Sequence, residues 1–197
     1  MKKIDILIAG VGGQGTILAG NIISKIAVAE NIDAKTAETH GMAQRGGSVI
    51  NHVRLGEKVY SPLIPEGSVD FLLSFEALEG LRYLPYLASN GTAIINTLQL
   101  FPLPVLTGDT SYPEELLNEI REKANKTIAV DSYNIEPVKS NPRVLNIFLI
   151  GILSTLLPFK EEVWTLAINE TLPPKILDIN LKAFNAGRSW ANDNAQH

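Results

Sequence analysis

The hydrophobic and polar positions of this chain form two repeating patterns, which predict strands alternating with helices. The apolar run over 4–9, which ends at Gly10, is typical of a strand buried on both faces, and apolar residues at helical spacing follow over 16–29. The same patterns place further strands at 32–39, 69–75, 92–96 and 127–130, and further helices at 76–87, 113–124, 142–157, 161–170 and 174–189. This alternation predicts a three-layer, Rossmann-like α/β domain with a mostly parallel sheet.

Residues 49–55 depart from this scheme because Val49, Val53 and Leu55 share one face of a strand, and Ile50, His52 and Arg54 share the other. Such alternation is typical of a strand with one buried face. Gly56-Glu57 is a turn signal that leads into 59–60, so we predict an antiparallel β-hairpin at this point. A second turn is predicted at Asn90-Gly91, immediately before the strand at 92–96.

The three final helical segments are expected to complete a single domain. A chain of 197 residues is long enough for one substantial core. Gly187 is typical of a helix end. We therefore expect a domain over 1–190 and a disordered tail over 191–197. Asn146 lies in an otherwise apolar helix, and its amide requires either a partner within the chain or a position that faces a site or an interface, of which we favour the interface.

The first glycine-rich segment, 10–15, satisfies the pattern G-x-G-x-x-G between a predicted strand and a predicted helix. Free amides and the helix dipole at such a position favour an anion. A dinucleotide site also needs an acidic residue after the second strand, and Glu38 lies about eight positions later than the usual spacing of about twenty residues. The segment is therefore open to NAD(P), to another phosphate or carboxylate ligand, or to a purely structural role.

The second glycine-rich segment, 39–49, surrounds one cation, one imidazole and one amide with glycines. Gly46 and Gly47 permit close approach of a ligand or a partner chain to the backbone. Arg45 offers a planar fork of donors that suits phosphate or carboxylate. His40 is a candidate proton donor, although a lone histidine is more often a satisfied polar residue. The segment predicts a contact site without identifying the contact.

Composition removes several classes of chemistry from this chain. Cysteine is absent, so the chain has no disulfide and no thiolate for a zinc site, an iron–sulfur cluster or nucleophilic catalysis. Its net charge of −4 argues against a broad nucleic-acid surface. No His, Asp and Glu cluster has metal-ligand spacing, so we expect no metal site. The apolar run 144–157 is too short to span a bilayer, and the N-terminus shows no signal peptide, so a cytoplasmic location is expected.

The two glycine-rich segments together resemble those of the gamma-type subunits of 2-oxoacid:ferredoxin oxidoreductases. The segment 8–15, with its double glycine followed by Gln14, is similar to the N-terminal loop of that family. The segment 39–49 resembles its second signature, in the form typical of the beta subunit of indolepyruvate:ferredoxin oxidoreductase. The similarity continues through Asp70, Phe75-Glu76 and the final helices, and so covers almost the whole chain.

The resemblance implies a non-cluster subunit of an enzyme complex. A larger partner subunit is expected to carry thiamine diphosphate and the iron–sulfur clusters, to decarboxylate an aryl 2-oxoacid such as indolepyruvate, and to reduce ferredoxin. The acyl group passes to coenzyme A, and this chain contributes to the active-site cleft and to coenzyme A binding. The implied binding residues are Gly12, Gly13, Gln14, Gly15, Thr39, His40, Gln44, Arg45, Gly46 and Gly47, with His40 the candidate catalytic residue.

Two other interpretations stay open at this stage. One is a free-standing nucleotide- or coenzyme A-binding α/β protein of the same fold, and the other is an NAD(P)-dependent dehydrogenase. A homodimer is also expected when the chain is isolated, because a subunit without its partner exposes apolar surface.

Overall fold

The computed structural model describes residues 3–40 and 47–194, and for His40 it describes the backbone alone. Its centre is a six-stranded sheet in the order β2-β3-β1-β4-β5-β6. The strands are β1 (Ile4–Val11), β2 (Asp33–His40), β3 (Ser48–Gly56), β4 (Val69–Ser74), β5 (Leu87–Asn96) and β6 (Lys126–Val130). Strand β3 runs opposite to the common direction of the other five strands described, so the prediction of a mostly parallel sheet is confirmed.

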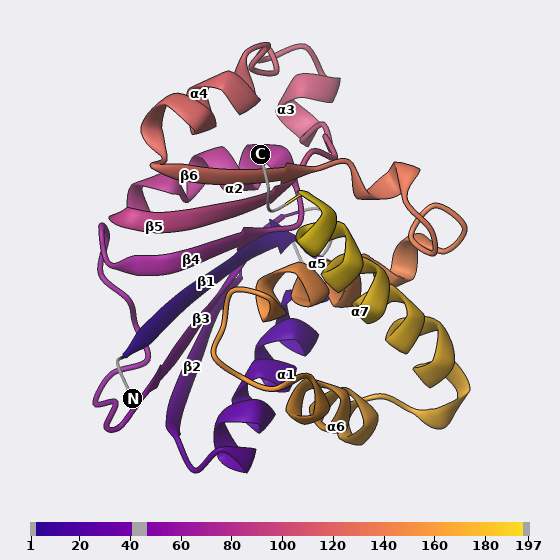
Figure 1. Cartoon of the computed structure of the whole chain (residues 1–197). Helices are drawn as coiled ribbons and strands as arrows, with labels where there is room; N and C mark the ends of the chain where they lie inside the picture. The colour runs from indigo at the N-terminus through magenta and orange to yellow at the C-terminus, as the bar shows by residue number, and fades with distance from the viewer. Residues whose placement is uncertain (1–2, 41–46, 195–197) are drawn as a thin grey trace.

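Helices cover both faces of the sheet and complete the three layers (Figure 1). The helices are α1 (Thr16–Ala29), α2 (Ala77–Arg82), α3 (Leu103–Leu106), α4 (Leu116–Lys123), α5 (Leu145–Ser154), α6 (Glu161–Thr171) and α7 (Pro174–Asn194). Helices α1, α5, α6 and α7 lie on one face, whereas α2 and α4 lie on the other. Single-turn 3-10 helices occupy Leu84–Tyr86, Ser132–Asn134 and Pro142–Val144.

Strand β1 shows why a continuous apolar run forms the centre of the sheet. Ile6 and Ile8 point into the core shared with α1, whereas Leu7 and Ala9 point into the core shared with α2. All four side chains are fully buried. A strand covered on both faces needs apolar residues at successive positions, as the sequence predicted.

An antiparallel β-hairpin is present, as predicted, but it joins β2 to β3 and not β3 to residues 59–60. Strands β2 and β3 pair antiparallel, with Asp33 opposite Gly56 and His40 opposite Val49. The connection between them therefore falls at 41–47, and residues 59–60 form no strand. The turn prediction at Gly56-Glu57 was wrong because the side-chain pattern of 49–55 identifies a strand but not its pairing partner.

Two other glycine predictions were also wrong. Strand β5 continues through Asn90-Gly91, where its register against β4 shifts, so no turn separates two elements there. Helix α7 continues past Gly187 to Asn194, four residues beyond the expected domain end at 190. The expected disorder over 191–197 is therefore not seen at 191–194, and residues 195–197 lie outside the described part of the chain.

Gly187 has a packing role instead of a terminating one. A Cβ atom at Gly187 would lie 2.0 Å from the backbone oxygen of Phe148 in α5, and one at Gly151 would lie 2.2 Å from the backbone oxygen of Phe184 in α7. The backbones of α5 and α7 therefore touch directly. Across residues 3–40 and 47–194, no helix is both long and apolar enough to cross a membrane.

Candidate functional site

The two glycine-rich segments lie side by side at the carboxyl edge of β1. Val11 at the end of β1 pairs with Ser48 at the start of β3, and the Gly12 amide donates to the Gly47 carbonyl oxygen over 2.9 Å. Residues 12–15 are separated from 47–48 by more than thirty positions in the sequence. The fold thus unites the ends of the two motifs that the sequence singled out separately. We call Gly12–Gly15, Gly47, Ser48, Glu76 and Glu79 the carboxyl-edge site.

This edge lies where the connections of the sheet change direction. Neighbouring strands β1 and β4 run parallel, yet α1 leaves β1 toward one face and α2 follows β4 on the other. In open α/β sheets, ligands bind beyond the carboxyl ends of the strands at such a point. The fold therefore supports a binding role here independently of the glycine motif.

The side chain of Gln14 links the first glycine-rich segment to the sheet through two hydrogen bonds. Its side-chain oxygen accepts from the Val11 amide over 2.7 Å, and its side-chain nitrogen donates to the Phe75 carbonyl oxygen over 3.3 Å. The side chain thereby bridges the ends of β1 and β4. Direct contact of Gln14 with a ligand stays a prediction, and the structure gives this residue a positioning role.

The backbone of the first glycine-rich segment has unusual φ angles, and only some of its amides donate a hydrogen bond to another described residue. Gly13 and Gly15 have φ angles of +101° and +85°, which side chains rarely tolerate. The amides of Gly12 and Gln14 are occupied by Gly47 and Val11 respectively. The amides of Gly13 and Gly15 make no hydrogen bond with another described residue, and they precede the N-terminus of α1, where the helix dipole favours an anion.

The side chain of Asn146 packs against the first glycine-rich segment at Gly15. The side chain is buried in α5, its amide nitrogen lies 3.5 Å from the Gly15 carbonyl oxygen, and a Cβ at Gly15 would come within 2.4 Å of that nitrogen. The interface favoured from the sequence is therefore wrong, since Asn146 is buried against a partner inside the chain.

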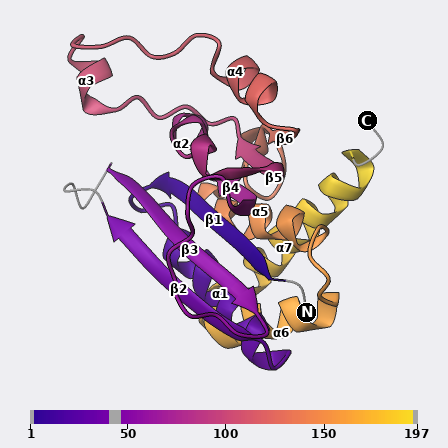
Figure 2. The same cartoon turned by 90° about the vertical axis from the view of Figure 1, so that its left-hand side faces the viewer.

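The second segment is only partly described. Thr39 and His40 end strand β2, opposite Ile50 and Val49 of β3. Gln44, Arg45 and Gly46 lie outside the described residues, as does the side chain of His40. Their predicted roles stay predictions, and the structure fixes only the two strand ends from which the segment emerges, visible at the left of Figure 2.

A cluster of polar side chains borders the second segment, and the sequence analysis gave it no role. The buried carboxylate of Glu79 accepts from the Ser48 hydroxyl, and its other oxygen pairs with Arg82 over 3.2 Å. The Ser48 hydroxyl also lies 2.9 Å from that of Tyr83. Ser48 follows the glycine pair directly, so these contacts fix the direction in which the chain leaves that pair.

Glu76 completes the cluster from the start of α2. Its carboxylate accepts from the amides of Glu79 and Leu100, over 2.8 and 3.0 Å, and from the Tyr112 hydroxyl over 3.2 Å. Burial raises the pKa of Glu76, and these three donors act in the opposite direction. The spacing of Glu76 and Glu79, three residues apart at a helix start, was the sequence signal for this cap.

The position of Glu38 weakens the dinucleotide interpretation. In a dinucleotide fold the acidic residue ends a strand that lies directly beside β1. Here β3 lies between β1 and β2, so Glu38 is two strands away from the first glycine-rich segment, roughly 10 Å in the sheet. Within the described ranges, no group of three or more His, Asp or Glu side chains is arranged to hold a metal ion.

His52, on β3, is a structural histidine whose burial predicts a dependence of fold stability on pH. It is buried, and its Nδ1 accepts from the Ile64 amide over 3.2 Å. Burial, and secondarily the Arg54 charge, lower the pKa of His52 below its ordinary value of 6.5. The unfolded chain therefore binds the proton first, and stability contributed by neutral His52 is lost as the pH falls below about 6.5.

We expect urea unfolding to show this loss between pH 7.5 and pH 5.5. The His52→Asn variant keeps an acceptor near the Ile64 amide but does not titrate, so its stability should fall less over the same interval. The difference between the two proteins cannot exceed about 1.4 kcal/mol, because only one pH unit of this interval lies below the unfolded pKa of about 6.5. Parallel curves for both proteins would show that His52 does not titrate differently on folding.

Comparisons with known proteins identify the family of this chain. The fold and the joined glycine segments define a Rossmann-like α/β protein. The sequence profile of the pyruvate ferredoxin/flavodoxin oxidoreductase family matches residues 5–190. The chain belongs to this family, which confirms the resemblance seen in the sequence.

Individual relatives and solved structures show which members of this family the chain is similar to. The chain is 40% identical over 193 residues to the indolepyruvate oxidoreductase subunit IorB of Archaeoglobus fulgidus, and the match covers 96% of each chain. The fold matches the gamma subunit of a keto/oxoacid ferredoxin oxidoreductase from Geobacter sulfurreducens with a TM-score of 0.70 and 23% identity, over 96% of this chain and 99% of that one. It also matches 32% of a 2-oxoglutarate:ferredoxin oxidoreductase chain from Magnetococcus marinus, over 98% of this chain, with a TM-score of 0.71 and 20% identity.

Proposed function

We propose that this chain is the cluster-free subunit of an oxidoreductase that acts on aryl 2-oxoacids such as indolepyruvate. The observation that carries the proposal is the 40% identity to an indolepyruvate oxidoreductase subunit over 96% of both chains. In the assembled complex the 2-oxoacid loses carbon dioxide, its acyl group passes to the thiol of coenzyme A, and two electrons pass to ferredoxin. A larger partner subunit supplies thiamine diphosphate and the cysteines for iron–sulfur clusters, which this chain lacks. In this proposal the chain is cytoplasmic.

The carboxyl-edge site gives this chain a part in binding coenzyme A. The amides of Gly13 and Gly15 lie just before the N-terminus of α1, where the helix dipole favours an anion. Gly47, which bonds to Gly12, belongs to the second glycine-rich segment, so the two segments adjoin. In our proposal Arg45 pairs with a phosphate or a substrate carboxylate, while His40 and Gln44 line a cleft shared with the partner. Gly46 and Gly47 permit the backbone to approach the ligand.

Reconstitution tests the overall function. The chain is co-expressed with the larger thiamine-binding subunit, and reduction of ferredoxin is measured with indolepyruvate and coenzyme A, singly and together. We expect a complex whose turnover needs both substrates. A chain that binds coenzyme A without any such partner, and that does not assemble with it, would instead be a free-standing binding protein.

Arg45→Ala tests the role of the second segment. In the assembled complex we expect the KM for coenzyme A or for the oxoacid to rise at least tenfold, because a charge-assisted hydrogen bond is worth about 1.5–3 kcal/mol. Arg45→Lys keeps the charge but loses the fork of donors, so it should recover only part of the affinity. An assembled Arg45→Ala complex with both KM values unchanged refutes the role given to Arg45.

A further inference from the structure

An exposed apolar segment projects near the carboxyl-edge site without any role in the core. Residues 97–108, which we call the apolar arm, include no charged side chain. Leu100, Phe101, Leu103 and Leu106 on this arm are four of the ten exposed large hydrophobic side chains among the described residues. Helix α3 buries none of its residues, and Leu103 and Leu106 are 71% and 68% exposed. Such a concentration in twelve residues marks an interaction surface.

The base of the arm is held firmly by the carboxyl-edge site. The Leu100 amide donates to Glu76, and the Ala77 amide donates to the Leu98 carbonyl oxygen over 2.9 Å. The Phe101 ring lies edge-on to that of Tyr112, whose hydroxyl donates to the same Glu76 carboxylate. Glu76 therefore ties the arm to the first turn of α2, beside Glu79 and the second glycine-rich segment.

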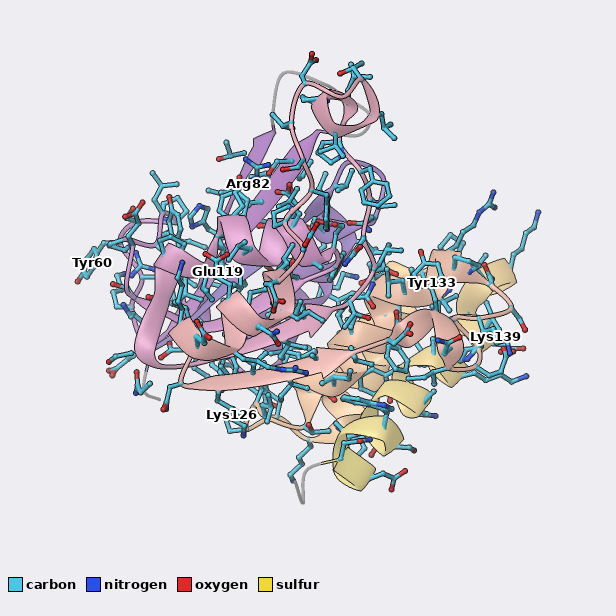
Figure 3. All side chains as sticks on the ribbon, turned by 90° about the horizontal axis from the view of Figure 1, so that it is seen from above. Tyr60, Arg82, Glu119, Lys126, Tyr133 and Lys139 are labelled. Carbon is cyan, nitrogen blue, oxygen red and sulfur yellow. The ribbon has the colours of Figure 1, made fainter. Side chains whose placement is uncertain are left out.

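The arm and the strand ends lie on one side of the molecule. Figure 2 shows α3 on the same side as the carboxyl end of β2 and the start of β3, and Figure 3 shows the pink α3 segment projecting beyond the end of α2 marked by Arg82. A partner that covers the carboxyl-edge site thus also meets the arm. Figure 3 also places Tyr133 and Lys139 away from this projection.

We propose that the apolar arm docks into an apolar groove with a basic rim on the larger subunit of the complex. This inference rests on the proposed function. A specific interface takes about 20–30 residues from each side, so a twelve-residue arm must be part of a larger contact, and its base makes the carboxyl-edge site the adjoining part. A related fold that forms only 32% of a longer chain, in Magnetococcus marinus, shows that this unit also exists attached to further protein.

Charge favours the larger subunit over a second copy of this chain. Exposed acidic residues follow the arm at Asp109, Glu114 and Glu115, and the net charge of the chain is −4. A symmetric dimer through the arm would bring both sets of carboxylates to the rim of one interface, where like charges oppose association. An apolar groove with a basic rim on the partner complements both the apolar arm and the acidic residues that follow it.

The test combines two exposed positions on the arm with two matched positions elsewhere. The arm variant is Leu103→Glu with Leu106→Glu. The control variant is Val28→Glu with Leu166→Glu, on α1 and α6, where the side chains are 73% and 50% exposed. Both variants add the same charge, and neither alters a buried side chain, so both should keep the thermal unfolding midpoint of the parent chain.

Assembly with a tagged larger subunit is then measured by co-purification and by titration. We expect the parent and control chains to assemble alike, and the arm variant to bind at least tenfold more weakly. Equal assembly of the arm variant overturns the docking proposal but leaves the proposed function intact. Failure of the parent chain to assemble overturns both. A homodimer of the isolated chain that the arm variant alone dissociates assigns the arm to a second copy and also overturns the proposal.

Discussion

Replacing Gly187 by alanine should destabilise the fold by about 3 kcal/mol, the upper part of the usual range for overpacking. In the middle of a helix, glycine to alanine is otherwise favourable by nearly 1 kcal/mol, so propensity alone predicts the opposite sign. The reversal follows from the contact of α5 with α7, where the added Cβ would lie 2.0 Å from the Phe148 carbonyl oxygen. A backbone atom cannot move aside as a side chain does, so the helices must separate.

Separation of α5 from α7 would disturb the larger of the two cores. Every residue of α5 is buried, and Phe184 of α7 stacks on Trp164 with ring centroids 6.2 Å apart. Thermal or urea unfolding measures the effect, with Asn185→Ala as the control on an exposed position of the same helix. The control should change stability by less than about 0.5 kcal/mol. A Gly187→Ala protein as stable as its parent would contradict the close approach of the two helices.

Periodicity predicted most of the elements because burial itself is periodic. The 14-residue helix α1 matches its predicted range of 16–29, and β1 follows from the run of apolar residues that both faces require. The failures share one cause. Each failure is a local turn or stop signal: Gly187, Asn90-Gly91 and Gly56-Glu57. At each position, the structure is decided by the distant segment that packs or pairs there, which the local signal does not report.

The candidate site was predictable in part for a related reason. Glycine motifs show in the sequence because they depend on backbone geometry, and the structure joins them through Gly12 and Gly47. Glu76 and Glu79 have no such motif beyond a helix cap, since their partners, Leu100 and Ser48, are 24 and 31 positions away. Long-range side-chain contacts of this kind leave no local pattern, so the cluster emerged only from the fold.

The same cluster leads to the second large effect, which concerns ligand binding. Glu79→Ala removes the buried acceptor of the Ser48 hydroxyl and leaves the Ser48 and Tyr83 hydroxyls to each other. Loss of a buried partner costs about 1–3 kcal/mol of stability. It also removes one of the contacts that hold the end of the second glycine-rich segment, which keeps the Gly12 hydrogen bond and the pairing of β3 with β1 and β2.

In the assembled complex, we therefore expect Glu79→Ala to raise the KM for coenzyme A about tenfold, equivalent to about 1.4 kcal/mol of binding. The turnover number should fall less, because Glu79 acts through the segment and not on the reacting atoms. Glu79→Gln keeps an acceptor for Ser48 and should restore most of the affinity. Arg82→Ala removes only a half-exposed ion-pair partner, worth at most about 1 kcal/mol, and should leave the KM near that of the parent. The three variants are assayed well below their unfolding temperatures. If all of them have the same KM for coenzyme A as the parent, Ser48 and Glu79 stabilise the fold without positioning the binding segment.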